Sequence, residues 1–149
     1  MVSRLVLLDS GPLGLASNPG RSKAAAECTL WLRTLAAGGT RILVPEIADY
    51  EVRRELLRAG KTAGVARLDA LAMTLEYLPI TTAAMRLAAE LWADARRAGR
   101  PTAGSDALDG DVILAAQALS LGVAELVVAS SNVAHLVRYV ASAPWADIV

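Results

Sequence analysis

The chain has 149 residues, which suits a single domain over residues 1–149 with a substantial buried core and no need of disulfides. Apolar residues make up 54% of the chain, but Phe is absent and aromatic residues reach only 4%, so aromatic stacking of single-stranded nucleic acid is not expected. Lys plus Arg total 15 and Asp plus Glu total 15, and this zero net charge does not indicate a globally basic nucleic-acid binder.

Four short apolar runs predict strands that are covered on both faces, because each run is continuous rather than alternating. They lie at residues 4–8, 41–44, 75–80 and 126–129. Longer patterns predict helices at 22–37, 45–59, 64–74, 81–98 and 109–121, with a shorter one at 132–141. Residues 11–14 are interpreted as a turn, and residues 145–149 are expected to add an edge strand.

Strands that alternate with helices predict βαβ units and a parallel sheet. Right-handed crossovers place helices on both faces, so the predicted fold is α/β, with three α/β/α layers and four or five parallel strands. Ligands of such sheets bind beyond the carboxyl ends of the strands. The polar residues at those ends are therefore the candidates for function.

The cellular compartment is indicated by the cysteine content and by the first residues. Cys28, the one cysteine, lies in an apolar helical pattern and is expected to be a buried, inert thiol. The apolar run at residues 5–8 ends at Asp9 and is too short for a signal peptide, and no stretch reaches the roughly 18 apolar residues of a membrane span. We therefore expect a protein of the reducing cytoplasm without membrane contact.

Two candidate acids lie in the first half of the chain. Asp9 directly follows the first strand, where it is either a functional carboxylate or a turn or helix-cap aspartate. Glu51 borders the apolar stripe of its helix and either leans over the end of the sheet or forms a surface ion pair with Arg54. Glu55 lies on the same edge and is the alternative if Glu51 points to solvent.

Two further acids, Asp109 and Asp111, open the strongly apolar helix at 109–121. Capping and the helix dipole account for one aspartate at this position. Both together, with Asp106 just upstream, exceed what capping needs. Because that helix is predicted to be buried, its first residues are expected near the sheet.

Short polar residues, Ser130, Ser131 and Asn132, follow the fourth strand. They can bind a metal-bound water or a phosphate, and they can equally cap the next helix. His135, the only histidine, is expected to be structural or at the surface. The sequence contains no zinc-type His/Cys cluster, no glycine-rich nucleotide loop and no serine nucleophile elbow.

The carboxylates therefore offer the best account of function. Several of them around one pocket repel one another unless a cation is present, and oxygen ligands favour Mg²⁺ or Mn²⁺. Such an ion can activate water and neutralise a phosphodiester. We predict that Asp9, Glu51 and Asp111 are catalytic and bind the metal, with Asp109 and Asn132 at the same site.

In their order and spacing these residues resemble the PIN-domain family, including its VapC-type toxins, over nearly the whole chain. Asp9 matches an aspartate after the first strand, and Glu51 matches a glutamate in the helix after the second. Asp111 matches the aspartate of an Asp-x-x-Ile/Leu-Ala-Ala helix, and Ser130-Ser131-Asn132 matches a Thr/Ser-x-Asn/Asp element. The family position at Asn132 is often aspartate, and Asp109 is the residue that can compensate for the amide.

The resemblance implies a metal-dependent endoribonuclease that cleaves single-stranded or structured RNA. For the toxin branch it also implies a homodimer that a small antitoxin neutralises. Ser130, Arg54 and Arg97 are the predicted substrate contacts. Arg54 belongs to a first group of arginines, with Arg53 and Arg58. Arg97 belongs to a second group, with Arg96 and Arg100. For both groups, a solvated charged face without an RNA contact is an equally weighted interpretation.

Two other functions stay open. A non-catalytic PIN-like module that binds protein or RNA agrees with the zero net charge and with Asn132, whereas the three retained acids argue against it. A phosphatase-type or small-ligand α/β domain would need a glycine loop that cradles phosphate, which the sequence lacks.

Overall fold

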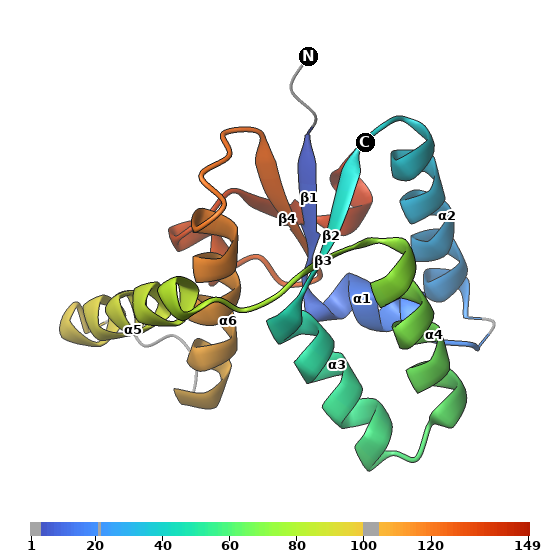
Figure 1. Ribbon diagram of the computed structural model, residues 1–149, viewed down its shortest axis with the longest axis horizontal. Helices are drawn as coiled ribbons and strands as arrows, with labels where there is room; N and C mark the ends of the chain where they lie inside the picture. Colours follow the sequence, from blue (N-terminus) through green and yellow to red (C-terminus); the bar gives the residue numbers. More distant parts are fainter. Residues whose placement is uncertain (1–3, 21, 100–104) are drawn as a thin grey trace.

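The computed structural model describes residues 4–20, 22–99 and 105–149 (Figure 1). Its strands form one parallel sheet in the order β3-β2-β1-β4-β5. They are β1 (Leu5–Leu8), β2 (Arg41–Pro45), β3 (Glu76–Leu78), β4 (Leu126–Ser130) and β5 (Ser142–Pro144). The prediction of a parallel sheet of four or five strands is confirmed.

Helices connect the first four strands, and a short 3₁₀ turn lies between β4 and β5. The helices are α1 (Ser10–Ser17), α2 (Lys23–Ala37), α3 (Glu46–Arg58), α4 (Thr62–Thr74), α5 (Thr82–Arg97) and α6 (Ser105–Leu119), with 3₁₀ turns η1 (Leu136–Arg138) and η2 (Trp145–Asp147). Arg100 and the side chain of Asp106 lie outside the description. None of the described helices is long and apolar enough to cross a membrane.

The layers follow from the alternation of side chains along the central strand. Val6 and Leu8 of β1 belong to the apolar layer shared with α1, α2, α3 and α4. Leu5 and Leu7 point to the opposite face, where α6 covers the sheet. Small apolar side chains join α5 to the outer side of α6, and Figure 1 shows this pair on one side of the sheet and α1 to α4 on the other. The predicted three-layer α/β/α fold is confirmed.

The prediction of a turn at residues 11–14 is wrong, because these residues lie in helix α1. Asp9 is its N-cap, and the Asp9 side chain accepts a hydrogen bond from the first amide of the helix. Pro12 lies in the first turn, where its missing N–H has no partner to lose. Leu13 is fully buried in the apolar layer, so tertiary packing stabilises a helix that local sequence disfavours.

The last part of the chain also differs from prediction. Residues 132–141 form only the short turn η1, whose Leu136 is buried, because the chain must extend again at once to form β5. The predicted edge strand at residues 145–149 is wrong: the strand precedes it, and Trp145 begins a 3₁₀ turn. Its indole packs on Trp31 with ring centroids 5.4 Å apart, which draws this segment onto the apolar layer.

Candidate active site

The carboxyl ends of β1 and β4 lie side by side, because Leu8 and Ala129 are partners in the parallel register. The Asp9 amide donates to the Ala129 carbonyl at 2.9 Å, so pairing extends one residue beyond β1. Ser130 ends β4, and its hydroxyl donates to Oδ2 of Asp9 at 2.6 Å. The sheet thus joins two candidate residues from opposite ends of the chain.

Asp9 is held at both carboxylate oxygens. Oδ1 accepts from the Ser10 amide at 2.7 Å, and Oδ2 accepts from Ser130. Ser130 is fully buried, and its hydroxyl also accepts from the Asn132 amide at 3.0 Å. Asp9 therefore caps α1 and also faces the strand ends. Ser130, predicted as a substrate contact, is placed instead to orient Asp9, because a buried hydroxyl does not reach RNA.

Glu51 extends from α3 towards the first turns of α6. A Cβ atom added at Gly110 would lie 3.0 Å from Oε2 of Glu51, so the carboxylate rests against backbone that carries no side chain. Burial raises the pKa of Glu51, and the negative charges of Asp9 and Asp111 raise it further, while Arg54 opposes them. Glu51 points into the site, so Glu55 is not needed as its replacement.

Asp111 completes a group of three carboxylates. Burial is again the main cause that raises its pKa, followed by the charge of Asp9, whereas His135 acts in the opposite direction. Asp9, Glu51 and Asp111 come from β1–α1, α3 and α6 and lie in one another's electric field. His135, expected to be structural or at the surface, is half-buried within reach of this field.

The other predicted ligands are placed less centrally. Asp109 is exposed on α6. Asn132 is exposed too, and its side-chain oxygen accepts from the Ala134 amide at 3.3 Å. Among the side chains that the structure describes, those of residues 4–20, 22–99 and 109–149, no three acidic, histidine or cysteine groups are arranged around one point as metal ligands. Repulsion between bare carboxylates favours such separation.

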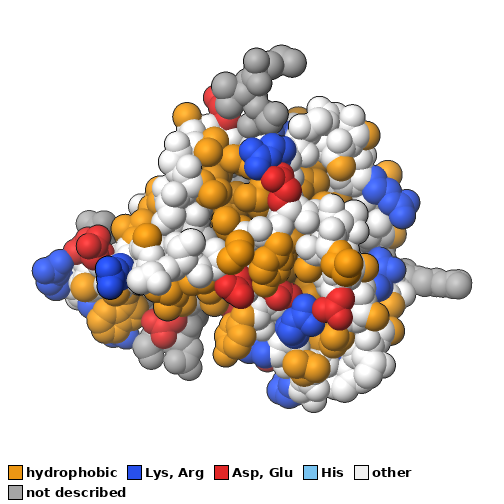
Figure 2. Space-filling model, in the orientation of Figure 1, with side chains coloured by type: hydrophobic (Ala, Val, Ile, Leu, Met, Phe, Trp, Pro, Cys, Tyr) orange, Lys and Arg blue, Asp and Glu red, His pale blue; other side chains and the backbone are white. Residues whose placement is uncertain are grey.

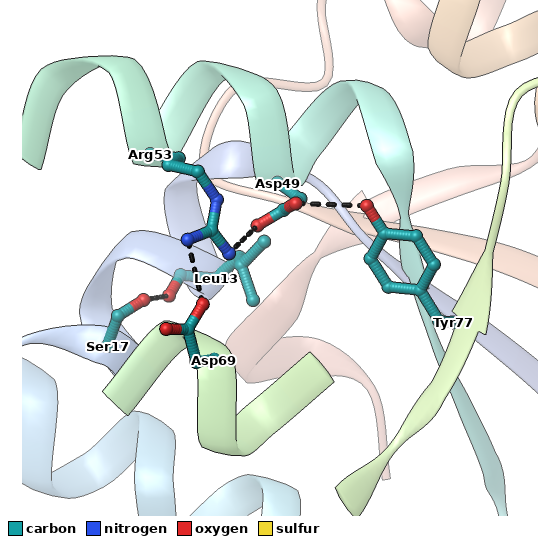
Figure 3. A network of polar contacts seen from close by, with 6 residues as sticks. All are labelled: Leu13, Ser17, Asp49, Arg53, Asp69 and Tyr77. Carbon is teal, nitrogen blue, oxygen red and sulfur yellow. Dashed lines mark hydrogen bonds and ion pairs between the residues drawn. The ribbon is translucent and has the colours of Figure 1, made fainter. Parts of the chain in front are cut away.

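The arginines of α3 divide into two kinds. Arg53 donates to Asp49 at 3.0 Å and to Asp69 at 2.7 Å, and Tyr77 donates to the other oxygen of Asp49 at 2.9 Å (Figure 3). This network ties α3 to α4 and β3, so Arg53 is occupied by the fold. Arg54 is exposed, with its guanidinium 5.1 Å from the ring centroid of Tyr50.

The two arginines at the C-terminal end of α5 lie away from the carboxylates of the candidate site. Arg97, a predicted substrate contact, pairs with Asp94, and Arg96 lies 5.0 Å from the ring centroid of Trp92. Figure 1 shows the C-terminal end of α5 at the edge of the molecule, well apart from α1 and α3. On the face drawn in Figure 2, red acidic and blue basic side chains lie side by side over the lower half, in keeping with the zero net charge.

Comparison with known proteins places the fold. No family model matches the sequence, and no curated protein matches it. Among solved structures, VapBC2 from Rickettsia felis, bound to a DNA fragment from its promoter, matches with a TM-score of 0.73 and 17% identity over 95% of this chain and 98% of that chain. The chain has the PIN-like fold.

Two other solved structures agree. FitAcB from Neisseria gonorrhoeae matches with a TM-score of 0.69 and 20% identity, over 96% of this chain and 99% of that chain. DNA-bound VapBC from Salmonella typhimurium matches with a TM-score of 0.67 and 19% identity, over 97% and 99%. At these identities the similarity concerns the PIN-like fold and not the chemistry of the site, which depends on the residues of this chain.

Proposed function

We propose that this chain is a metal-dependent endoribonuclease that hydrolyses RNA phosphodiester bonds. The observation that carries the proposal is that Asp9, Glu51 and Asp111 lie beyond the carboxyl end of a parallel sheet, near enough for the charge of Asp9 to raise the pKa values of the other two. Their donor atoms are all carboxylate oxygens, which fit Mg²⁺ or Mn²⁺. These three residues would hold the ion, with Asp109 or Asn132 next to them.

A bound divalent ion would acidify a water and neutralise charge on the phosphate. The residues of the chain have separate tasks. Asp9 keeps one orientation because hydrogen bonds hold both of its oxygens. Burial and the charge of Asp9 raise the pKa values of Glu51 and Asp111 in the metal-free chain. With the ion bound, a carboxylate oxygen of either residue that does not ligate the ion would be placed to accept the proton of an attacking water.

The cleavage assay uses purified protein and a panel of single-stranded and structured RNAs. We expect cleavage with Mg²⁺ or Mn²⁺ and none in EDTA. Asp9→Asn should lose about 10²–10⁴-fold or more in rate, and Ser130→Ala, which frees Asp9 from its orienting bond, about 10–100-fold. Asp94→Asn removes an exposed acid on α5 and is the matched control, expected to cleave like the wild type.

Metal binding is tested apart from activity by calorimetric titration with Mn²⁺. Asp111→Asn should bind more weakly than the wild type, and Asp94→Asn should bind equally well. Equal binding by the wild type and Asp111→Asn would contradict the metal site. Equal trace cleavage by the wild type and Asp9→Asn would indicate contamination, and the non-catalytic interaction module would then be the better account.

We further propose that the chain is the toxin of a cytoplasmic toxin–antitoxin pair and forms a homodimer. The support is the PIN-like fold shared with VapBC and FitAcB structures, two of them solved with DNA. A small antitoxin encoded beside this chain should co-purify with it and block cleavage. Light scattering of the chain alone should give twice the mass of 15.6 kDa.

A further inference from the structure

A groove of about 500 Å³ lies between α1 and α3, directly beside Glu51. One wall is the start of α1, where Ser10, Gly11 and Gly14 present little or no side chain. The opposite wall carries the charged residues of α3 and of the turn that follows. They are Glu51, Arg54, Glu55, Arg58 and Lys61.

The three cations of this groove form a row that starts next to the carboxylates. Arg54 and Arg58 are four residues apart on α3, the spacing that keeps side chains on one face of a helix, and Lys61, in the turn after the helix, lines the same groove. From Glu51 to Arg58 the helix rises roughly 10 Å. The row therefore leads away from the carboxyl end of the sheet, along one side of α3.

These cations can meet a ligand. Arg58 pairs with Glu55 at 2.9 Å, but its side chain is 73% exposed, and such surface pairs contribute only about 0–1 kcal/mol. A phosphate can therefore displace Glu55. Arg53, one residue from Arg54, is by contrast held by Asp49 and Asp69 on the α4 side (Figure 3).

We propose that this groove binds the sugar-phosphate backbone of a single RNA strand on its way to the carboxylates, with Arg54, Arg58 and Lys61 at successive phosphates. The inference rests on the proposed function and adds the path of the substrate. The groove between two helices is too small for a duplex, and it offers cations without an aromatic platform. Contacts to phosphates position a strand without reading its bases, so the groove should bind RNA of any sequence.

The test measures binding by fluorescence anisotropy of a labelled single-stranded oligoribonucleotide over a series of salt concentrations. All proteins carry Asp9→Asn so that RNA stays intact in Mg²⁺. The groove variant is Arg58→Gln/Lys61→Gln. The control variant is Arg96→Gln/Arg97→Gln, which removes the same charge from α5. Thermal unfolding of each variant verifies that the fold is kept.

We expect the slope of log affinity against log salt to become shallower by about 1.4 in the groove variant, since each lost phosphate contact on a single strand removes about 0.7. The control should keep the parent slope. An unchanged slope in the groove variant, or an equal change in the control, would overturn the proposal that the groove binds RNA. The proposed nuclease function would still stand if the wild type cleaves RNA. The groove would be a general site for acidic polymers if polyglutamate bound with the same salt dependence and the groove variant weakened that binding. This result would also overturn the proposal of an RNA groove.

Discussion

The contact between α1 and the loop after β4 gives a sharp test of how the site is held. Gly11 lies in the first turn of α1 and faces Ser131. A Cβ atom at Gly11 would overlap Oγ of Ser131 and lie 2.8 Å from its Cβ. The hydroxyl can rotate away, but the Cβ atom moves only with the loop. Gly11→Ala should therefore displace the loop that starts at Ser131, directly after Ser130, the residue that orients Asp9.

The magnitude follows from two opposing effects. Overpacking typically costs about 1–3 kcal/mol, and alanine in place of glycine in a helix returns up to about 1 kcal/mol. We expect Gly11→Ala to lower the free energy of unfolding by about 1–2 kcal/mol, and Tm by roughly 2–8 °C in a chain of this length. Cleavage should fall together with stability, because Asp9 loses its fixed orientation.

The matched control is Gly14→Ala in the same helix, where a Cβ atom would lie 3.9 Å from Cγ2 of Val52, an ordinary contact. This variant should be neutral or more stable by up to about 1 kcal/mol. Ser131→Gly removes the clashing atoms, so it should rescue Gly11→Ala in a double-mutant cycle followed by urea unfolding. Equal stability of the two alanine variants, or additivity in the cycle, would refute the steric explanation.

Three further predictions concern buried or half-buried groups. The raised pKa of Glu51 means that the metal-free protein loses stability as pH rises from the ordinary Glu pKa of 4.5 through the folded value. Glu51→Gln should therefore raise the free energy of unfolding at pH 7 by about 0.2–1 kcal/mol per relieved like-charge pair, raise Tm with it, and flatten this pH dependence in calorimetry. Burial raises the pKa of the Cys28 thiol to about 11, so a disulfide reagent at pH 8 should modify Cys28 only in denaturant; stoichiometric reaction of the native protein within minutes would contradict its burial. Gln117 accepts from the Ile47 amide at 3.3 Å and donates to the Leu78 carbonyl at 2.9 Å, so Gln117→Leu should cost about 1–3 kcal/mol for each buried group left unpaired; urea unfolding with a loss below 1 kcal/mol would contradict this.

The strands β1, β2 and β4 could be predicted because each is a continuous apolar run, whereas the short β5 was missed. The sheet brought the residues after β1 and β4 together as expected. The helix α1 could not be predicted from the sequence. Pro12 and two glycines indicate a turn locally, and only the cap by Asp9 and the burial of Leu13 make a helix favourable. The opposite error occurred at residues 132–141, where the spacing predicts a helix but the structure has only η1. The chain must extend after η1 so that β5 can pair with β4.

The site was predictable in its residue types but not in its contacts. The positions of Asp9 after a strand, of Glu51 at the edge of an apolar stripe and of Asp111 at the predicted start of a helix identify them as candidates. The helix α6 in fact begins earlier, at Ser105, so Asp111 lies inside it. Only the packing of α3 against α6 shows why Gly110 is a glycine, since Glu51 lies against it. The difference between Arg53 and Arg54 is likewise invisible in sequence, because it depends on which one faces Asp69 of α4.

The same arrangement explains why the site is costly to the folded chain. Glu51 and Asp111 are partly buried, and burial together with Asp9 raises both pKa values, so ionising them near neutral pH opposes folding. Two apolar layers on the sheet must offset that cost. A divalent cation that binds only the folded chain would remove the repulsion and stabilise the fold by mass action. The same three carboxylates would then lower the stability of the metal-free chain and raise the stability of the metal-bound chain, and catalysis would need them in the metal-bound chain.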